Sequence, residues 1–301
     1  MSQSGSKEGA GAAPRTAGEM LRLGREFLAR KRIAEARLDA ELLVAHALGV
    51  DRLRLFLELD RPLAAEEVER GRELLARRAK REPVAYITGR REFYGRTFAV
   101  DASVLIPRPE TELLVDRARE IAREKGRTDL RFLDVGTGSG AIAVTLALEL
   151  AGSRVVGVDV SAAALEVARR NAAGLDVPEG AVEFVEGDGA LAVRALGPFD
   201  FVVSNPPYVP AEARDSLEPE VRDHEPALAL FAPAGDPDHW VRRLIAEAQE
   251  LLVTGGVLLV EIGHDQAERA VGLAGAWTKR VHVDMAKVPR VVEVRFAEQA
   301  T

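Results

Sequence analysis

Apolar residues recur at helical spacing over roughly the first quarter of the chain. Side chains three or four positions apart share one face of a helix, so this spacing predicts helices that pack on one another. The positions that share a face are Leu38, Leu42 and Ala45, and Val68 and Leu75. Pro62 separates two of the helices, and the last of them covers residues 64–81. We predict a small N-terminal helical bundle domain over residues 16–82.

The periodicity changes after residue 82. Phe93, Tyr94, Phe98 and Val100 lie around Gly95, a pattern that predicts a β-hairpin. We expect residues 83–108 to form a hairpin linker between two domains. The paired prolines of Pro107-Arg108-Pro109 interrupt regular structure, and a helix is predicted to follow over residues 111–124.

The remainder alternates between short β-rich apolar runs and helical segments. This alternation predicts an α/β domain with a doubly wound, mainly parallel sheet over residues 109–301. Only a short turn separates the last two runs, so we expect them to form an antiparallel hairpin at the end of the sheet. The seven predicted strands are Arg131–Val135, Arg154–Val158, Val182–Val185, Phe199–Val203, Gly256–Ile262, Val281–Asp284 and Arg290–Phe296.

Composition narrows the function classes. The 301 residues carry a formal charge of −7 and no cysteine, which excludes disulfides, thiolate metal sites and a catalytic thiol. The acidic balance argues against a nonspecific grip on nucleic acid. No run approaches the roughly 18 apolar residues of a membrane span. We expect a cytoplasmic monomer without a metal, a membrane partner or stable nucleic acid, and a disordered tail over residues 1–15.

A glycine-rich loop follows the first strand of the sheet and opens a helix. The segment from Asp134 to Gly140 lets the backbone turn tightly and approach a bound nucleoside. Gly136, Gly138 and Ala141 also match the dinucleotide pattern, so this loop alone leaves the cofactor class open. Thr137 and Ser139 complete the loop, and Asp159 ends the next strand, where a carboxylate can accept hydrogen bonds from ribose hydroxyls.

Two carboxylates favour S-adenosylmethionine over a nicotinamide cofactor. Asp134 lies beside the loop, where it would orient a cationic amino acid moiety and repel a pyrophosphate. Asp188 follows the third strand with Gly189, at a position suited to an adenine amino group. We interpret the loop as a site for S-adenosylmethionine.

The segment Ser204-Asn205-Pro206-Pro207-Tyr208 follows the fourth strand and indicates the chemistry. Two prolines remove backbone donors and stiffen the loop, so the carbonyls of Asn205 and Pro206 and the Asn205 side chain remain as acceptors. Tyr208 offers a face for a planar group. Such acceptors align a planar –NH₂ group with an activated methyl, which predicts methylation of an amide or amino nitrogen.

These motifs resemble the bacterial release-factor glutamine methyltransferases, the PrmC/HemK family. The resemblance implies a Rossmann-like class I methyltransferase with a seven-stranded sheet and a small N-terminal helical bundle domain joined by a β-hairpin. Besides the glycine loop and the Asn-Pro-Pro-Tyr segment, the stretches that carry it are Pro83–Gly89, Arg91–Gly95, Leu105–Glu112, His224–Leu228 and Gly256–Gly263.

The resemblance also implies roles for residues. Gly136 to Gly140, Asp159, Gly189 and Asn205 would contact S-adenosylmethionine, and Asn205 to Tyr208 would hold the glutamine of a Gly-Gly-Gln motif in class 1 peptide chain release factors. Arg108 would line the substrate site, and the helical domain would dock the release factor. Gly189 departs from the family, which often has a bulky aromatic residue there.

Four alternatives remain open on the sequence alone. In the first two alternatives the methyl acceptor differs, because Asn-Pro-Pro-Tyr suits any planar –NH₂ group. It would be a glutamine of a ribosomal protein in one, and an amino group of adenine or guanine in the other. A nicotinamide-dependent oxidoreductase and a non-catalytic cofactor-binding regulator are the other two.

Trp240 and Trp277 are expected to be core residues.

Overall fold

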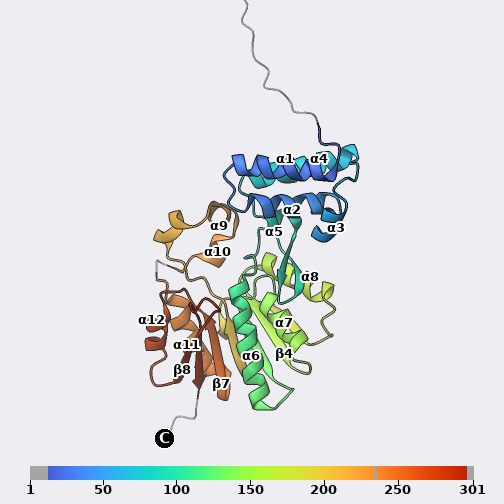
Figure 1. Ribbon diagram of the computed structural model, residues 1–301. Coiled ribbons are helices and arrows are strands. Elements are labelled where there is room, and N and C mark those ends of the chain that lie inside the picture. The colour runs from blue at the N-terminus through green and yellow to red at the C-terminus, as the bar shows by residue number, and fades with distance from the viewer. Residues whose placement is uncertain (1–12, 234–235, 297–301) are drawn as a thin grey trace, which may run out of the picture. The chain divides into compact units, whose positions relative to one another are not determined.

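The computed structural model describes residues 13–233 and 236–296, which form two compact units that divide between Thr88 and Gly89 (Figure 1). The segment 83–108, expected to be one linker, is shared between them. Its first part is a short helix of the N-terminal unit, and the hairpin belongs to the C-terminal unit.

Arg15, the last residue of the expected tail over residues 1–15, has partners for its backbone groups. The backbone N–H of Arg15 donates to Glu19 Oε2 at 2.7 Å, and the Arg15 carbonyl accepts from the Leu63 N–H at 3.0 Å. Arg15 is therefore anchored to the helical unit, because both of its backbone groups have partners within it. Residues 1–12 lie outside the described residues.

The N-terminal unit is helical, as predicted. Leu28, Leu43 and Leu55 are fully buried among its helices, together with Val68 and Leu75 from the predicted apolar face. Thr16 caps the first helix by accepting the Glu19 N–H at 3.2 Å. The helices are α1 (Ala17–Arg30), α2 (Ala36–Ala47), α3 (Arg52–Leu57), α4 (Ala65–Ala79) and α5 (Val84–Thr88).

The buried face of α2 differs from the predicted one. Leu38 is 37% exposed and Leu42 is half-buried, whereas Leu43 and Val44 are fully buried. Helix α2 contacts α1, α4 and α5, so most of its circumference is covered, and the Leu38–Leu42 stripe is the side left over. Ala45, the third residue of the predicted face, is buried. The prediction was wrong at Leu38 because α2 also buries acidic residues, which an apolar pattern counts as solvent-facing.

Two of those acidic residues are paired with arginines. Glu41 is 2% exposed and accepts from Arg25 at 2.7 Å, Arg37 at 3.1 Å and Arg52 at 2.6 Å. Asp39 accepts from the Arg78 Nε at 2.7 Å. Burying a carboxylate costs free energy unless a cation or donors compensate it, and here arginines do.

The hairpin at the start of the C-terminal unit consists of β1 (Arg90–Phe93) and β2 (Arg96–Ala99), which pair antiparallel. Its two-residue turn, Tyr94-Gly95, has φ angles of 51° and 70°. Two positive φ angles give a turn whose twist matches that of the strands, which favours glycine at the second position. The predicted hairpin is confirmed.

The sheet of the C-terminal unit has seven strands in the order β5-β4-β3-β6-β7-β9-β8. The first five are parallel, and β9 pairs antiparallel with both β7 and β8, which confirms the predicted terminal hairpin. The strands are β3 (Arg131–Val135), β4 (Arg154–Asp159), β5 (Val182–Glu186), β6 (Phe199–Ser204), β7 (Leu252–Glu261), β8 (Thr278–Val283) and β9 (Pro289–Phe296).

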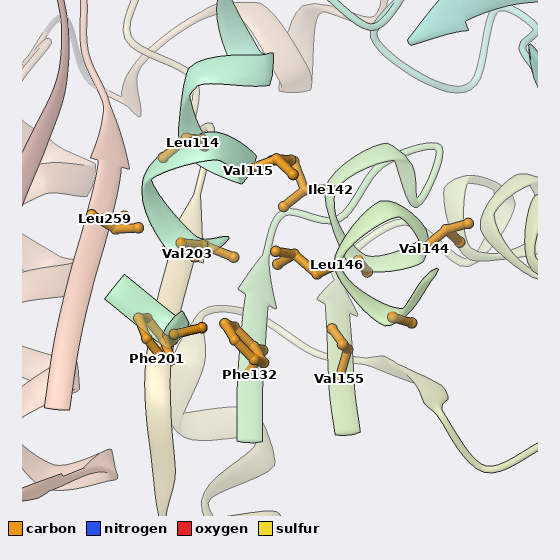
Figure 2. Packing of buried hydrophobic residues seen from close by; sticks show 14 of the residues in the cluster. Leu114, Val115, Phe132, Ile142, Val144, Leu146, Val155, Phe201, Val203 and Leu259 are labelled. Atoms are coloured by element: carbon orange, nitrogen blue, oxygen red, sulfur yellow. The ribbon is translucent and has the colours of Figure 1, made fainter. Parts of the chain in front are cut away.

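Helices cover both faces of this sheet. On one face Phe132 of β3 and Phe201 of β6 stack with ring centroids 4.5 Å apart, beneath Val115 and Leu146 of two covering helices (Figure 2). Leu133 points to the other face, because successive strand residues alternate.

The helices of the C-terminal unit are η1 (Pro109–Thr111), α6 (Glu112–Lys125), α7 (Ala141–Glu149), α8 (Ala162–Gly174), η2 (Ala190–Leu196), η3 (Ala211–Ser216), α9 (Pro219–His224), α10 (Ala227–Leu230), α11 (His239–Leu251) and α12 (Ala267–Leu273). Among the described residues, none of the helices is long and apolar enough to cross a membrane.

Candidate active site

A pocket opens at the carboxyl ends of the parallel strands. Strand β3 has β4 on one side and β6 on the other, so the chain that follows β3 moves toward one edge of the sheet and the chain that follows β6 moves toward the other edge. Ligands bind at such a switch point in open α/β sheets. The pocket is lined by the loops that follow β3, β4, β5 and β6, by Trp240 of α11 and by residues of two further segments. These are Ser103, Val104, Leu105, Pro107, Arg108 and Thr111, and Pro226, Leu228 and Ala229.

The glycine loop after β3 forms one wall. Gly136 and Gly138 line the pocket with φ angles of 73° and 54°, together with Thr137 and Ser139. Gly140, also predicted to bind the cofactor, is buried at the start of α7 and is not among the lining residues. A Cβ there would come within 3.1 Å of the Ala168 Cβ, so this glycine allows α7 and α8 to approach.

Asp159 lies at the end of β4 and lines the pocket, as its predicted role requires. It accepts the Gly138 N–H at 2.8 Å and the Ser161 N–H at 2.9 Å. Burial raises its pKa, and these backbone hydrogen bonds oppose the rise. Each carboxyl oxygen accepts one of these two bonds and keeps a further lone pair, which leaves Asp159 able to accept from a diol.

Asp134 does not reach the pocket, which corrects the interpretation that it orients a cationic ligand group. Its side chain is fully buried beneath the loop, where it accepts from the Thr137 hydroxyl at 2.7 Å and the Ala143 N–H at 3.2 Å. Burial raises the pKa of Asp134 to about 7. Residues alternate along β3, and Asp134 falls on the face covered by α7, so it supports the loop from behind.

Asp188 and Gly189 lie together on the opposite wall with an arginine that the sequence did not indicate. Arg243 donates to Asp188 Oδ1 at 2.7 Å and lies 4.9 Å from the Trp240 ring centroid. A Cβ on Gly189 would come within 2.3 Å of Arg243 Nη2, so the guanidinium fills the space beside this glycine. Asp188 is exposed, but its carboxylate is already paired with a cation.

Trp240 was predicted to be a core residue, and the structure corrects this. It is half-buried and lines the pocket, and its Nε1 donor is buried without a partner among the described residues. A tryptophan in a helix carries no local signal that separates core from pocket, because both positions are apolar. Trp277 packs on Phe296, with ring centroids 4.8 Å apart, as a core residue would.

The Asn-Pro-Pro-Tyr segment leaves β6 at the centre of the pocket. The Ser204 hydroxyl donates to the Val135 carbonyl at 2.7 Å, which ties the ends of β6 and β3 together. Asn205, Pro206 and Pro207 line the pocket, but Tyr208 is not among the lining residues. Burial raises the pKa of Tyr208, and the charge of Glu261 raises it further.

Thr111 and Glu261 are site residues that the sequence did not indicate. The Asn205 Nδ2 donates to the Thr111 Oγ1 at 3.0 Å. Glu261, at the end of β7, is 2% exposed, and burial raises its pKa to about 7. Because 94 residues separate Thr111 from Asn205 in the chain, no local pattern could have joined them.

Arg108 lines the pocket as predicted, and a second buried acid fixes it there. Its Nη2 donates to Glu225 Oε1 at 2.5 Å, and the other oxygen of Glu225 accepts the Ile106 N–H at 3.1 Å. The Glu225 side chain is 1% exposed. Through these two hydrogen bonds Glu225 holds the Pro-Arg-Pro segment beside the loop that precedes α10. Among the described residues, no group of three acidic or histidine side chains is arranged to hold a metal ion.

The fold and this site define the chain as a Rossmann-like class I methyltransferase. A family model described as the PrmC N-terminal domain matches residues 19–89, and one described as the methyltransferase small domain matches residues 110–219. A release factor glutamine methyltransferase of Chlorobaculum tepidum is 47% identical over 86% of this chain and 89% of that relative. Another, of Bradyrhizobium diazoefficiens, is 40% identical over 92% and 95%. The chain belongs to the release factor glutamine methyltransferase family.

Solved structures agree on the fold. The hMettl16 catalytic domain, solved with a MAT2A 3′UTR hairpin, is 17% identical and superposes with a TM-score of 0.53, covering 76% of this chain and 84% of that one. At this identity the likeness concerns the fold alone. Family membership excludes the oxidoreductase and regulator alternatives, since the matched relatives are methyltransferases.

The cofactor of this family is S-adenosylmethionine, and the pocket fits it. The loop from Gly136 to Ser139 offers a backbone without bulky side chains at its glycines, and Asp159 offers acceptors for ribose hydroxyls. Trp240 adds aromatic surface to the same pocket.

Proposed function

We propose that this enzyme transfers a methyl group from S-adenosylmethionine to the side-chain amide nitrogen (N5) of the glutamine in the Gly-Gly-Gln motif of class 1 peptide chain release factors. The observation that carries the proposal is the set of acceptors at Asn205. Its carboxamide is held through Nδ2 by Thr111, so Oδ1 is left for a substrate –NH₂ group. The two prolines that follow add carbonyl acceptors and no N–H donor.

The chemistry asked of the protein is mainly alignment. The bound cofactor supplies an activated sulfonium methyl. An amide nitrogen is a poor nucleophile because its lone pair is delocalised into the carbonyl. Acceptors on both of its hydrogens, from the Asn205 side chain and the backbone carbonyls of Asn205 and Pro206, draw electron density to nitrogen and orient its lone pair. The displaced amide proton leaves to water after the methyl has been transferred, so no strong base is required.

We assign the remaining predicted residues as follows. Gly136, Thr137, Gly138, Ser139 and Asp159 hold the cofactor, and Trp240 with Arg243 closes the wall at Asp188 and Gly189. Arg108, fixed by Glu225, lines the substrate side with Pro206 and Pro207. Tyr208 packs behind the segment beside Gly263, and we propose that it stiffens the loop rather than stacking on the substrate.

The helical unit over residues 16–82 is proposed to dock the release factor. Helix α3 supports this role, because Leu53 is 70% exposed and Leu57 is 76% exposed, and the neighbouring Phe56 is also exposed. Replacing Leu57 with serine should raise the KM for release factor severalfold and leave kcat and S-adenosylmethionine affinity unchanged. Val283→Ser, which alters an exposed apolar residue of β8, is the matched control. An unchanged KM in the Leu57 variant would argue against docking through α3.

We further propose that the enzyme is a cytoplasmic monomer with no stable nucleic acid or membrane partner. The formal charge of −7 argues against a nonspecific grip on nucleic acid. Light scattering after size-exclusion chromatography would give the mass of the purified protein, and a dimer mass would contradict this part of the proposal.

The test of the function is transfer of a tritiated methyl group from S-adenosylmethionine. The substrates are a purified release factor, its Gly-Gly-Gln glutamine-to-alanine variant, a mixture of ribosomal proteins and an unmethylated duplex DNA. We expect label in the unaltered release factor alone. Label in the ribosomal proteins or the DNA would replace the proposed acceptor with that one, and label in the glutamine-to-alanine variant would reject the Gly-Gly-Gln glutamine.

A further inference from the structure

An arginine and a tryptophan of α11 meet the loop that follows β5 at one wall of the pocket. Trp240 lines the pocket together with Asp188 and Gly189, and the guanidinium carbon of Arg243 lies 4.9 Å from the centroid of the indole ring. Arg243 is not among the lining residues, so its guanidinium supports the indole from outside the pocket. A guanidinium over a tryptophan ring is attracted by the ring electrons, which holds the indole in place.

Hydrogen bonds fix this guanidinium. Arg243 donates from Nη1 to Asp188 Oδ1 and from Nη2 to the Asp188 carbonyl, both at 2.7 Å, and from Nε to Glu247 Oε1 at 2.6 Å. Glu247 is 7% exposed, and its other oxygen accepts the Ala190 N–H at 2.6 Å. All three nitrogens of the guanidinium therefore have acceptors, and one side chain joins the loop after β5 to α11.

Gly189 leaves open the space that this guanidinium occupies. Its φ angle of 80° is left-handed, which favours glycine. A Cβ on this residue would collide with Arg243 Nη2 and come within 2.9 Å of Glu247 Oε2. An alanine at this position would therefore push the guanidinium away from its partners, so the loop, the arginine and the indole depend on one another.

This wall lies where the base of a bound nucleoside would fall. Asp159 is the proposed partner of the ribose hydroxyls, and its carbonyl accepts the Gly187 N–H at 2.9 Å, so the loop after β5 begins beside the ribose site. Val160, the next residue, lines the same pocket and is 52% exposed. An apolar side chain and an indole that are both open to the pocket suit a flat aromatic ring.

We propose that Trp240 contacts the adenine of S-adenosylmethionine and that Arg243 is a positioning residue, which holds the indole and the backbone of Asp188 and Gly189 against that base. The inference rests on the cofactor site of the proposed function and is independent of the methyl acceptor. It also changes the role of Asp188, whose side chain serves Arg243 rather than the adenine amino group.

The Kd of S-adenosylhomocysteine, measured by calorimetry, tests the role of Arg243. Arg243→Gln removes the cation and cannot reach all three acceptors, so it should raise this Kd about tenfold, the scale of one or two polar contacts. Arg242→Gln is the matched control, because Arg242 is the adjacent arginine of α11 and pairs with Asp236 outside the pocket. Its Kd should change less than about twofold, and equal Kd values in the two variants would overturn the role.

A double variant separates positioning from general damage to the fold. Gly189→Ala keeps the arginine but takes its space, so it should raise the Kd about as much as Arg243→Gln. The combination of Gly189→Ala with Arg243→Gln should then raise the Kd little further, because residues that act as one unit are not additive. Effects that multiply in the double variant, or a wild-type Kd in Gly189→Ala, would reject the dependence of the wall on this guanidinium.

Fluorescence tests the contact with the base. The chain has two tryptophans, so Trp277→Phe leaves Trp240 as the reporter, and Trp240→Phe leaves Trp277 as the control. Saturating S-adenosylhomocysteine should quench the emission of Trp240, because adenine stacks on the indole, and leave the emission of Trp277 unchanged. Unchanged emission of Trp240, with binding seen by calorimetry, would overturn the contact.

Asp159→Asn keeps the inference separate from the site on which it rests. The amide has one acceptor oxygen where the carboxylate has two, so this variant should raise the Kd of S-adenosylhomocysteine at least tenfold. A wild-type Kd in Asp159→Asn would reject the cofactor site of the proposed function, and the inference with it. A raised Kd there beside a wild-type Kd in Arg243→Gln would reject the inference alone.

Discussion

Two buried acids of the helical unit and two of the sheet unit have opposite surroundings. In the helical unit Glu41 receives three arginines, and Asp39 receives Arg78. Burial alone would raise the pKa of Glu41, but hydrogen bonds from Arg52 and Arg37 and the charges of Arg25 and Arg52 outweigh it and lower the pKa. This acid is therefore ionised across the physiological range and contributes to folding.

In the sheet unit, Asp134 and Glu261 accept no hydrogen bond from an arginine among the described residues. Asp134 is held by a hydroxyl and a backbone N–H, and Arg290 acts on Glu261 only through its charge. Burial dominates in both, and the pKa of each is raised to about 7. Perturbed carboxyls concentrate at functional sites, and the contrast with Glu41 indicates that these two are retained at a cost in stability.

The largest effect we predict separates function from stability. Asn205→Ala should lower turnover by about a hundredfold or more, the scale of losing one positioned polar group, and keep S-adenosylmethionine affinity within about tenfold. The carboxamide is half-buried and lies at the end of a strand, so its loss should leave the midpoint of thermal unfolding nearly unchanged. Methyl transfer assays and calorimetry measure the two quantities. Comparable turnover in the variant would remove Asn205 from the proposed mechanism.

The sequence predicted the elements that depend on local pattern. Strand β3 has the predicted bounds, and β4 and β6 extend one residue further, because a run of apolar residues in a parallel sheet is buried on both faces. The hairpin turn at Tyr94-Gly95 and the loop at Gly136 were found for a similar reason, since left-handed backbone favours glycine. Most of the predicted site residues line the pocket through the loop that carries their own motif, and their roles stay predictions.

What the sequence could not provide depends on contacts between distant elements. Thr111 meets Asn205 only after η1 and β6 are assembled, and it carries no local signal of that contact. Asp134 was placed on the wrong side of its loop, because the motif shows the residue but not the face of β3 to which it belongs. Leu38 was placed on the packed face of α2, because the apolar pattern does not show that Glu41 is buried. The arginines that pair with Glu41 come from three separate positions in the chain.

The next prediction concerns the paired acid of the helical unit. Glu41→Gln leaves three arginines around a neutral side chain, which should lower the free energy of unfolding by about 2 kcal/mol at pH 7. The folded-state pKa of Glu41 is lowered, so this stabilisation is present above its unfolded pKa and lost as pH falls through the folded one. The difference from wild type should therefore shrink in acid.

Glu26→Gln is the matched control for this variant. Glu26 is paired with Arg22 on the surface of α1, with both side chains about half exposed, so its loss should change stability by less than about 0.5 kcal/mol. Denaturant titrations at pH 7 and pH 4 measure both variants. Equal effects for Glu41 and Glu26 would show that the arginine cluster contributes no more than an ordinary surface pair.

The smallest effect has the opposite dependence on pH. Asp134→Asn keeps an acceptor for the Thr137 hydroxyl and the Ala143 N–H but cannot ionise. The folded-state pKa of Asp134 is raised, so the wild type is most stable below the unfolded pKa and loses stability as pH rises through about 7. The variant should lack that loss and, at pH 8, unfold with a free energy on the order of 1 kcal/mol above wild type. Denaturant titrations between pH 5 and pH 8 measure the difference, and curves that stay parallel over this range would mean that Asp134 is ionised throughout, as Glu41 is.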